Sequence, residues 1–270
     1  MKTIRKWLLL AITFCVTLSI HAQSDGFFAG VKAGFGIPNL TAGSQSTPLS
    51  IGYSSRLGFY GGVIGEFQTK GRFGIRAEIN YSSQGGKREG LQALPVTAEL
   101  EPLWQMLTQL NVPHDNFMYA RIKSEAILNY LEIPVMAKYS FSLGSRLSFY
   151  LQAGPYMGVM LNSRNITSGS SSIYVDSKGE VPVDGILQQA QLPPIGVQSF
   201  DVDKDVTSDI RRINVGGEAA AGFGLIVGSG KFFVEGGGNY GFVPVQKSSV
   251  NGNNNTGAGT VTVGYLFQLR

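Results

Sequence analysis

Nine charged side chains are the first candidates for chemistry in this 270-residue chain, because they stand among apolar and small residues at a spacing of two. Four are basic and five are acidic: Lys32, Arg56, Arg76 and Lys138, and Glu66, Glu78, Glu132, Glu218 and Glu235. Burying a charge is costly unless the charge is paired. If these side chains share one interior, they can neutralise one another in an ion-pair network that closes it, or they can pass protons or ions along it.

A histidine beside an aspartate is the second candidate for chemistry. His114 precedes Asp115 in a polar stretch, and such residues occur in hydrolytic sites near the rims of membrane barrels. Adjacency in the sequence supplies neither a nucleophile nor the geometry of a catalytic triad. We therefore expect an exposed loop histidine and no catalytic residue.

Three alternating carboxylates form the third candidate. Asp201, Asp203 and Asp205 are spaced like the start of a calcium loop. Val206 stands where an EF-hand needs glycine, and Arg212 replaces the closing glutamate. The sequence therefore favours a solvated acidic loop, with no metal site and no cofactor.

Apolar and polar residues alternate with a period of two, and this pattern predicts that the nine charges lie on one face of their strands. In residues 26–36 one face carries Phe27, Val31 and Phe35, while the other carries glycines and Lys32. The same pattern recurs at 55–68, 72–83, 128–142, 146–161, 212–228, 231–242 and 259–269, and no Asp, Glu, Lys or Arg falls on an apolar face. In lipid only helices and closed barrels satisfy every backbone polar group. The pattern predicts an all-β fold, an eight-stranded antiparallel transmembrane β-barrel with its charges inside.

The connections between these segments alternate in length. Polar turns at 68–72, 142–146 and 228–231 are short, whereas 37–55, 84–127, 162–211 and 243–258 are long. Barrels of the outer membrane have short periplasmic turns and long extracellular loops. We therefore expect long extracellular loops and, because the strand number is even, both termini in the periplasm.

The N-terminal segment resembles a secretory signal. A positive start is followed by an apolar run from Trp7 to Ile20 and by Ala22 before Gln23, so we expect a signal peptide at 1–22 and a barrel domain at 23–270. Three of the 22 basic residues and none of the 18 acidic ones lie in that segment, leaving 19 against 18. The net charge without this segment is therefore +1, which gives no support for nucleic acid as a partner.

Several strand motifs resemble the PorT-like outer-membrane barrels of Bacteroidota. They are Gly30-Val31-Lys32-Ala33-Gly34, Arg76-Ala77-Glu78-Ile79-Asn80-Tyr81-Ser82, Tyr130-Leu131-Glu132-Ile133-Pro134 and Gly154-Pro155-Tyr156. The resemblance covers the strands and not the long loops, and one member type is associated with protein secretion. The terminal alternation into Phe267 also resembles the strand signal read by the barrel-assembly machinery. The resemblance therefore implies outer-membrane lipid, that machinery, and envelope or secretion proteins as partners.

The second long connection contains a predicted helix. Pro102 suits a first helical turn, and Leu103, Trp104, Leu107 and Leu110 follow at helical spacing on one face. This face could pack on neighbouring loops, or it could contact a partner through Trp104.

An eight-stranded barrel is just wide enough for side chains to fill. We therefore expect the charges to form a plug, and a non-enzymatic outer-membrane protein that acts through its surface loops, in a secretion or envelope assembly. Transport of a small solute is the first alternative and an enzyme of the barrel rim the second. A soluble lipocalin-like barrel is a further alternative.

Overall fold

The computed structural model describes residues 24–109, 111–250 and 252–269. The predicted signal peptide at 1–22 and Leu110 of the predicted helix lie outside these residues. No helix in the described ranges is long and apolar enough to cross a membrane.

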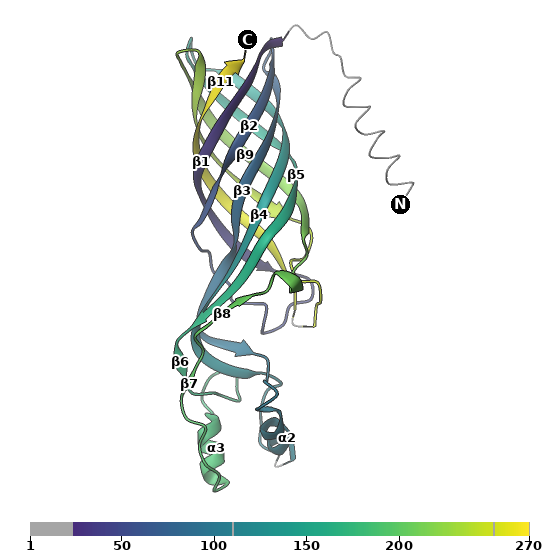
Figure 1. The fold of residues 1–270 in the computed structure, drawn as a ribbon, viewed down its shortest axis with the longest axis vertical. Coiled ribbons are helices and arrows are strands. Elements are labelled where there is room, and N and C mark those ends of the chain that lie inside the picture. The colour runs from purple at the N-terminus through teal and green to yellow at the C-terminus, as the bar shows by residue number, and fades with distance from the viewer. Residues whose placement is uncertain (1–23, 110, 251, 270) are drawn as a thin grey trace, which may run out of the picture.

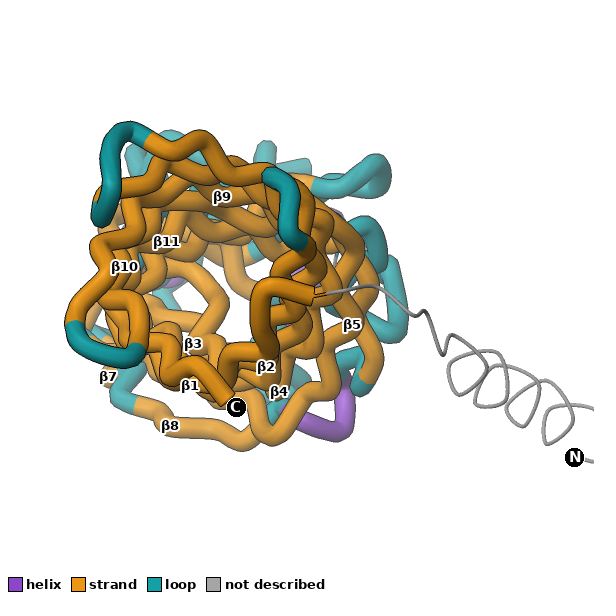
Figure 2. Tube along the Cα trace, turned by 90° about the horizontal axis from the view of Figure 1, so that it is seen from above, coloured by secondary structure: helices purple, strands orange, loops and turns teal. Residues whose placement is uncertain are grey.

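Eight long strands form one closed antiparallel ring (Figures 1 and 2). Each pairs with the next along the chain, and the last pairs back with the first, with Phe27 opposite Leu269. In ring order they are β1 (Ser24–Ala42), β2 (Gly58–Thr69), β3 (Phe73–Leu94), β4 (Met118–Ser142), β5 (Leu147–Ser168), β9 (Ile213–Val227), β10 (Gly230–Gly241) and β11 (Asn254–Leu269). The predicted eight-stranded barrel is confirmed.

The alternation separates an apolar outer wall from a polar interior. On β1 the side chain of Val31 is 55% exposed and that of Lys32 is 4% exposed. Outward phenylalanines, leucines and valines cover the wall around the ring, as a surface in lipid requires. The short turns and the described ends of β1 and β11 lie together at one end of the barrel, here called the turn end (Figure 1). The long connections lie at the other, the loop end.

Three strands continue beyond the ring at the loop end. β3 and β4 stay paired out to Leu94 and Met118, and β5 pairs with β8 (Val202–Asp205) on its far edge. The predicted connections at 84–127 and 162–211 were therefore too long, because much of each is strand. The parts of β3, β4 and β5 beyond the wall have no strictly apolar face. The alternation from which the strands were predicted therefore does not extend to them.

The tip of this extension carries two connections that we call the loop module, residues 95–117 and 169–201. The module contains α2 (Glu101–Gln109), β6 (Ser170–Ser171), α3 (Val183–Gln189) and β7 (Gln198–Ser199). Figure 1 shows α2 and α3 at the far end of the molecule from the barrel. The short helix η1 (Thr207–Asp209) connects β8 to β9.

Glycines let large interior side chains lie flat against the wall. A Cβ at Gly222 would lie 2.5 Å from the ring of Tyr150 and 2.7 Å from the carbonyl oxygen of Val234. A Cβ at Gly216 would lie 2.5 Å from the ring of Tyr156. Such contacts cannot form without a shift of the neighbour, so both glycines are required by packing.

Gly222→Ala is expected to lower the free energy of unfolding by ~1–3 kcal/mol, because the methyl group displaces Tyr150 from its place in the interior. Urea titration followed by circular dichroism in detergent micelles measures this change. Gly259→Ala is the matched control, since its Cβ would meet no atom within 4 Å. The control should shift stability by less than ~0.5 kcal/mol. Equal effects of both substitutions would contradict the packing argument.

Candidate functional site

Six of the nine predicted charges meet near the turn end of the interior, in a cluster that we call the ionic plug. Its members are Lys32, Glu66, Arg76, Glu78, Lys138 and Glu235, from β1, β2, β3, β4 and β10. Alternation along each strand aims them at the barrel axis. All six are buried.

Arg76 is the centre of the ionic plug. Its Nη2 lies 2.7 Å from Glu66 Oε2 and its Nη1 lies 2.8 Å from Glu235 Oε2. In the ring β3 and β10 stand four strands apart, on opposite walls. The pair between Arg76 and Glu235 therefore spans the bore directly.

The two lysines complete the charge balance of the plug. Lys138 Nζ lies 2.7 Å from Glu66 Oε2, and Lys32 Nζ lies 2.6 Å from Glu78 Oε2 and 3.3 Å from Glu235 Oε1. Each carboxylate thus has at least one cation in contact or near contact. Several charge-assisted hydrogen bonds are what a buried ion needs to offset the loss of its hydration.

Aromatic rings enclose the cations. The Arg76 guanidinium lies 5.2 Å from the centroid of the Tyr150 ring and 5.1 Å from that of Phe233. Lys138 Nζ lies 4.1 Å from the centroid of Tyr150, whose hydroxyl donates to Glu235 Oε2 at 2.9 Å. These contacts leave the plug packed by rings and add cation–π attraction.

Glu132 and Glu218 lie apart from the plug, further toward the loop end. Glu132 accepts hydrogen bonds from the side-chain amides of Gln84 and Asn239, at 3.2 and 3.0 Å. Glu218 accepts one from the Tyr60 hydroxyl at 3.0 Å. Within the described residues neither carboxylate forms an ion pair. Since β2 and β9 are also opposite strands, the bond between Tyr60 and Glu218 spans the bore a second time.

Arg56 does not join the interior network, and this corrects the prediction. β2 begins at Gly58, so Arg56 belongs to the segment before it, where its backbone N–H donates to the carbonyl of Pro38. Its Nε donates to Glu125 Oε1 at 2.6 Å, on the part of β4 that approaches the loop end. The predicted strand began at residue 55, three residues before the observed start of β2.

Lys231 is a further cation beside the ionic plug, and sequence reasoning missed it. Its Nζ lies 3.7 Å from Glu66 Oε1 and 4.8 Å from the centroid of the Phe28 ring. The signal was present, because Lys231 has the same parity on β10 as Glu235. The hydrogen-bonding roles of Tyr60 and Tyr150 had no comparable signal, since they depend on partners across the bore.

The loop module has a hydrophobic core of its own. Trp104 and Leu107 of α2 pack in one buried cluster with Met118 at the base and with Ile173, Val175, Val183 and Leu187 of the second connection. Leu103 is half-buried against the same cluster. The predicted helix is present, and it packs on a neighbouring loop. An exposed anchor role for Trp104 and Leu107 does not fit their burial.

Backbone hydrogen bonds tie the two connections together. Tyr119 and Tyr174 exchange N–H to carbonyl bonds of 2.9 Å in both directions, and the N–H of Asp115 donates to Val175 at 2.8 Å. The indole N–H of Trp104 donates to the carbonyl of Asp115 at 3.0 Å. The module is therefore a folded unit fixed to the strand extension.

The two remaining candidates, His114 and the alternating carboxylates, take part in local hydrogen bonds and ion pairs. His114 contacts the carbonyl of Val112 at 2.8 Å and the hydroxyl of Thr108 at 3.3 Å, and that hydroxyl donates to the carbonyl of Trp104. Among the hydrogen bonds of the described residues, none joins the side chain of His114 to the side chain of Asp115.

The three alternating carboxylates are used separately. Asp201 accepts from the N–H of Gly169, Asp203 pairs with Arg164, and Asp205 accepts from the N–H of Thr207. The described part of the chain contains no cluster of three His, Cys, Asp or Glu residues able to hold a metal ion.

Glu66→Gln is expected to lower the free energy of unfolding by about 3–5 kcal/mol, because it leaves Arg76 and Lys138 buried with one partner fewer. Glu218→Gln is the matched control, since that carboxylate has no cation to lose, and it should change stability by less than about 1 kcal/mol. Urea titration of both variants measures the difference. A Glu218 variant as unstable as the Glu66 variant would contradict this division of the interior.

Leu107→Ala is expected to open the loop module and leave the barrel folded, because a buried leucine replaced by alanine costs ~2–5 kcal/mol in a small core. Limited proteolysis should cut 95–117 and 169–201 faster, while the strands remain resistant. Gln105→Ala, on the exposed face of the same helix, should cleave like the unmodified protein. Loss of the whole barrel with Leu107→Ala would show that the module is not a separate unit.

Comparisons with known proteins agree with this architecture. Residues 21–247 match the family described as outer membrane protein beta-barrel domain. No curated protein matches the chain.

Among solved structures, the outer membrane protease OmpT from Escherichia coli is 10% identical with a TM-score of 0.44, covering 94% of this chain and all of that one. Neisserial surface protein A is 12% identical with a TM-score of 0.38, covering 91% and 99%. Ail, the attachment invasion locus protein of Yersinia pestis, is 10% identical with a TM-score of 0.37, covering 90% and 99%. At such values we derive nothing about function from them. The family match spans most of the chain, and the chain therefore belongs to the outer membrane protein beta-barrel domain family.

Proposed function

We propose that this outer-membrane β-barrel is a non-enzymatic protein whose loop module binds another protein of the cell envelope, as part of a secretion or envelope assembly. The observation that carries the proposal is the contrast between the two ends of the molecule. The interior is crossed by direct side-chain bonds, whereas the loop end carries a folded unit far from the wall (Figure 1).

The closed interior supports a binding role over transport. The guanidinium of Arg76 contacts carboxylates from two other strands, and it is fully buried. A solute passing through the barrel would have to break these pairs and the contact between Tyr60 and Glu218. Separating buried ion pairs without replacement costs several kcal/mol.

The shape of the loop end supports recognition of a partner. A hollow of about 380 Å³ lies beside α2, lined among others by Leu49, Val96, Trp104, His114 and Phe117. A second of about 410 Å³ lies where the first long connection meets the strand extension, around Arg88 and Tyr119. Both hollows combine apolar side chains with polar ones, and binding sites are concave surfaces on which polar groups fix the orientation of what binds.

The expected orientation fits the same role. With the short turns in the periplasm, the loop module faces outward, the signal peptide at 1–22 is removed and both termini of the barrel domain at 23–270 are periplasmic. The resemblance to PorT-like barrels supports an assembly of secretion or envelope proteins as the setting.

A photo-cross-linking amino acid at Gln105, on the exposed face of α2, tests the proposal in intact outer membranes. The expected result is one defined protein adduct, identified by mass spectrometry. The adduct should disappear when Leu107→Ala is added, because that change opens the module that presents Gln105.

Ser145 in the turn-end hairpin is the matched control position, since it is equally exposed and lies at the opposite end of the barrel. The same adduct from both positions would reject the loop module as the binding surface. Absence of any adduct from Gln105 would also count against the proposal.

A further inference from the structure

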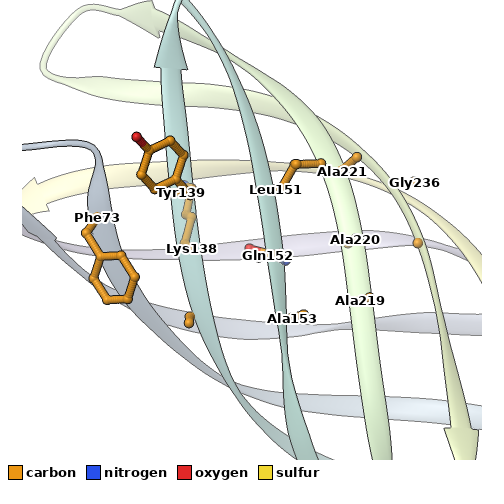
Figure 3. Close-up of a pocket in the computed structure, with 12 residues that line it drawn as sticks. Phe73, Lys138, Tyr139, Leu151, Gln152, Ala153, Ala219, Ala220, Ala221 and Gly236 are labelled. Carbon is orange, nitrogen blue, oxygen red and sulfur yellow. The ribbon is translucent and has the colours of Figure 1, made fainter.

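A groove of about 570 Å³ lies on the outer wall, across β4, β5, β9 and β10 (Figure 3). Its floor consists of small residues, among them Ala153, Ala219 and Gly236. Phe73, Tyr139 and Leu151 are its large outward side chains, whereas Lys138 and Gln152, which also line it, are buried.

The strand register explains why the wall is hollow here. Ala137 stands opposite Ala153, Ala153 opposite Ala219, and Ala219 opposite Gly238. These outward positions therefore place a continuous row of small residues across four strands. Beyond the groove, the next outward positions toward the turn end on β9 and β10 carry larger groups, Phe223 and Val234. The groove is therefore a depression floored by small residues and bordered by larger outward side chains, among them Phe73, Tyr139 and Leu151.

The groove lies in the turn-end half of the membrane-crossing wall. Phe73 is the first residue of β3, and Leu151 is four residues from the start of β5. At ~3.4 Å per residue and a tilt of ~40°, these positions lie within roughly 15 Å of the turn end, the depth of one lipid leaflet.

The rim above this groove is basic. Arg72 directly precedes Phe73, and its carbonyl accepts from the N–H of Ser140 beside Tyr139. Arg146 directly precedes β5, the strand that carries Leu151, and its carbonyl accepts from the N–H of Ile226 on β9. Both side chains are exposed, and neither forms an ion pair within the described residues. The acids described near the turn end, Glu66, Glu78 and Glu235, are buried in the ionic plug.

We propose that this groove is a binding site for an anionic phospholipid, with one acyl chain in the small-residue depression and the phosphate between Arg72 and Arg146. Guanidinium groups are well matched to phosphate oxygens. Tyr139, with a polar tip and an apolar ring, suits the boundary between headgroup and chain. The inference concerns the wall and the turn end, so it stands independently of the binding role of the loop module.

Charge decides between a lipid and a second protein as the occupant. The groove itself is apolar, and the charges beside it are of one sign and at one end only. A lipid with one anionic head and apolar tails has that distribution, whereas a transmembrane partner would meet the same groove without needing the two arginines.

Native mass spectrometry of the folded protein tests the site, with phosphatidylglycerol as the probe and phosphatidylcholine of the same chains as its neutral comparison. The unmodified protein should retain phosphatidylglycerol preferentially. Arg72→Gln with Arg146→Gln should lower its affinity about thirtyfold and remove the preference, the effect expected for two surface arginines near anionic lipid. Ala153→Leu with Ala219→Leu should fill the groove and weaken both lipids.

Matched variants separate the site from general effects. Arg212→Gln removes an exposed charge at the loop end, and Ala33→Leu enlarges an outward alanine on β1, across the ring from β5. Both should bind like the unmodified protein, and the gel shift of unheated samples verifies that every variant is folded. Equal retention of the two lipids by the unmodified protein would overturn the proposal. Unchanged binding by either the arginine pair or the alanine pair would do the same.

Discussion

The ion pair between Arg76 and Glu235 is the interaction on which the interior depends. It joins opposite walls of the ring, and Glu66, Lys138 and Lys32 gather around it. A charge buried in a barrel must find its partners inside, because the wall is apolar and the bore is too narrow for full hydration. The plug thus follows from one constraint, and it makes the barrel a closed support for what lies at either end.

The two ends meet different surroundings, and their residues reflect this. At the loop end, paired strands leave the wall and carry a module with its own buried core around Leu107 and Val175. At the turn end the strands stop at short hairpins with exposed Arg72 and Arg146. The composition of the loop end suits a binding surface in water. The composition of the turn end suits a basic rim at a layer of lipid headgroups.

Sequence reasoning identified what alternation controls and failed where alternation ends. The eight strands and the inward direction of Arg76 and Glu235 follow from the alternation of apolar and polar residues. This alternation is strict in the wall, because one face of each strand contacts lipid and the other contacts the charged interior. Arg56 was misplaced because its strand begins at Gly58, and the outer parts of β3 and β4 were missed because no lipid selects an apolar face there. Helical spacing found α2, but the burial of Trp104 depends on Ile173 and Leu187, which are distant in the sequence.

Electrical recording from planar bilayers containing the purified protein tests the closed interior most directly. The account predicts no single-channel steps from the folded protein, because Arg76 and Tyr60 hold side chains of opposite walls together. Stable ohmic channels from folded single barrels would contradict it. They would show that the ionic plug opens and that transport is the function to pursue.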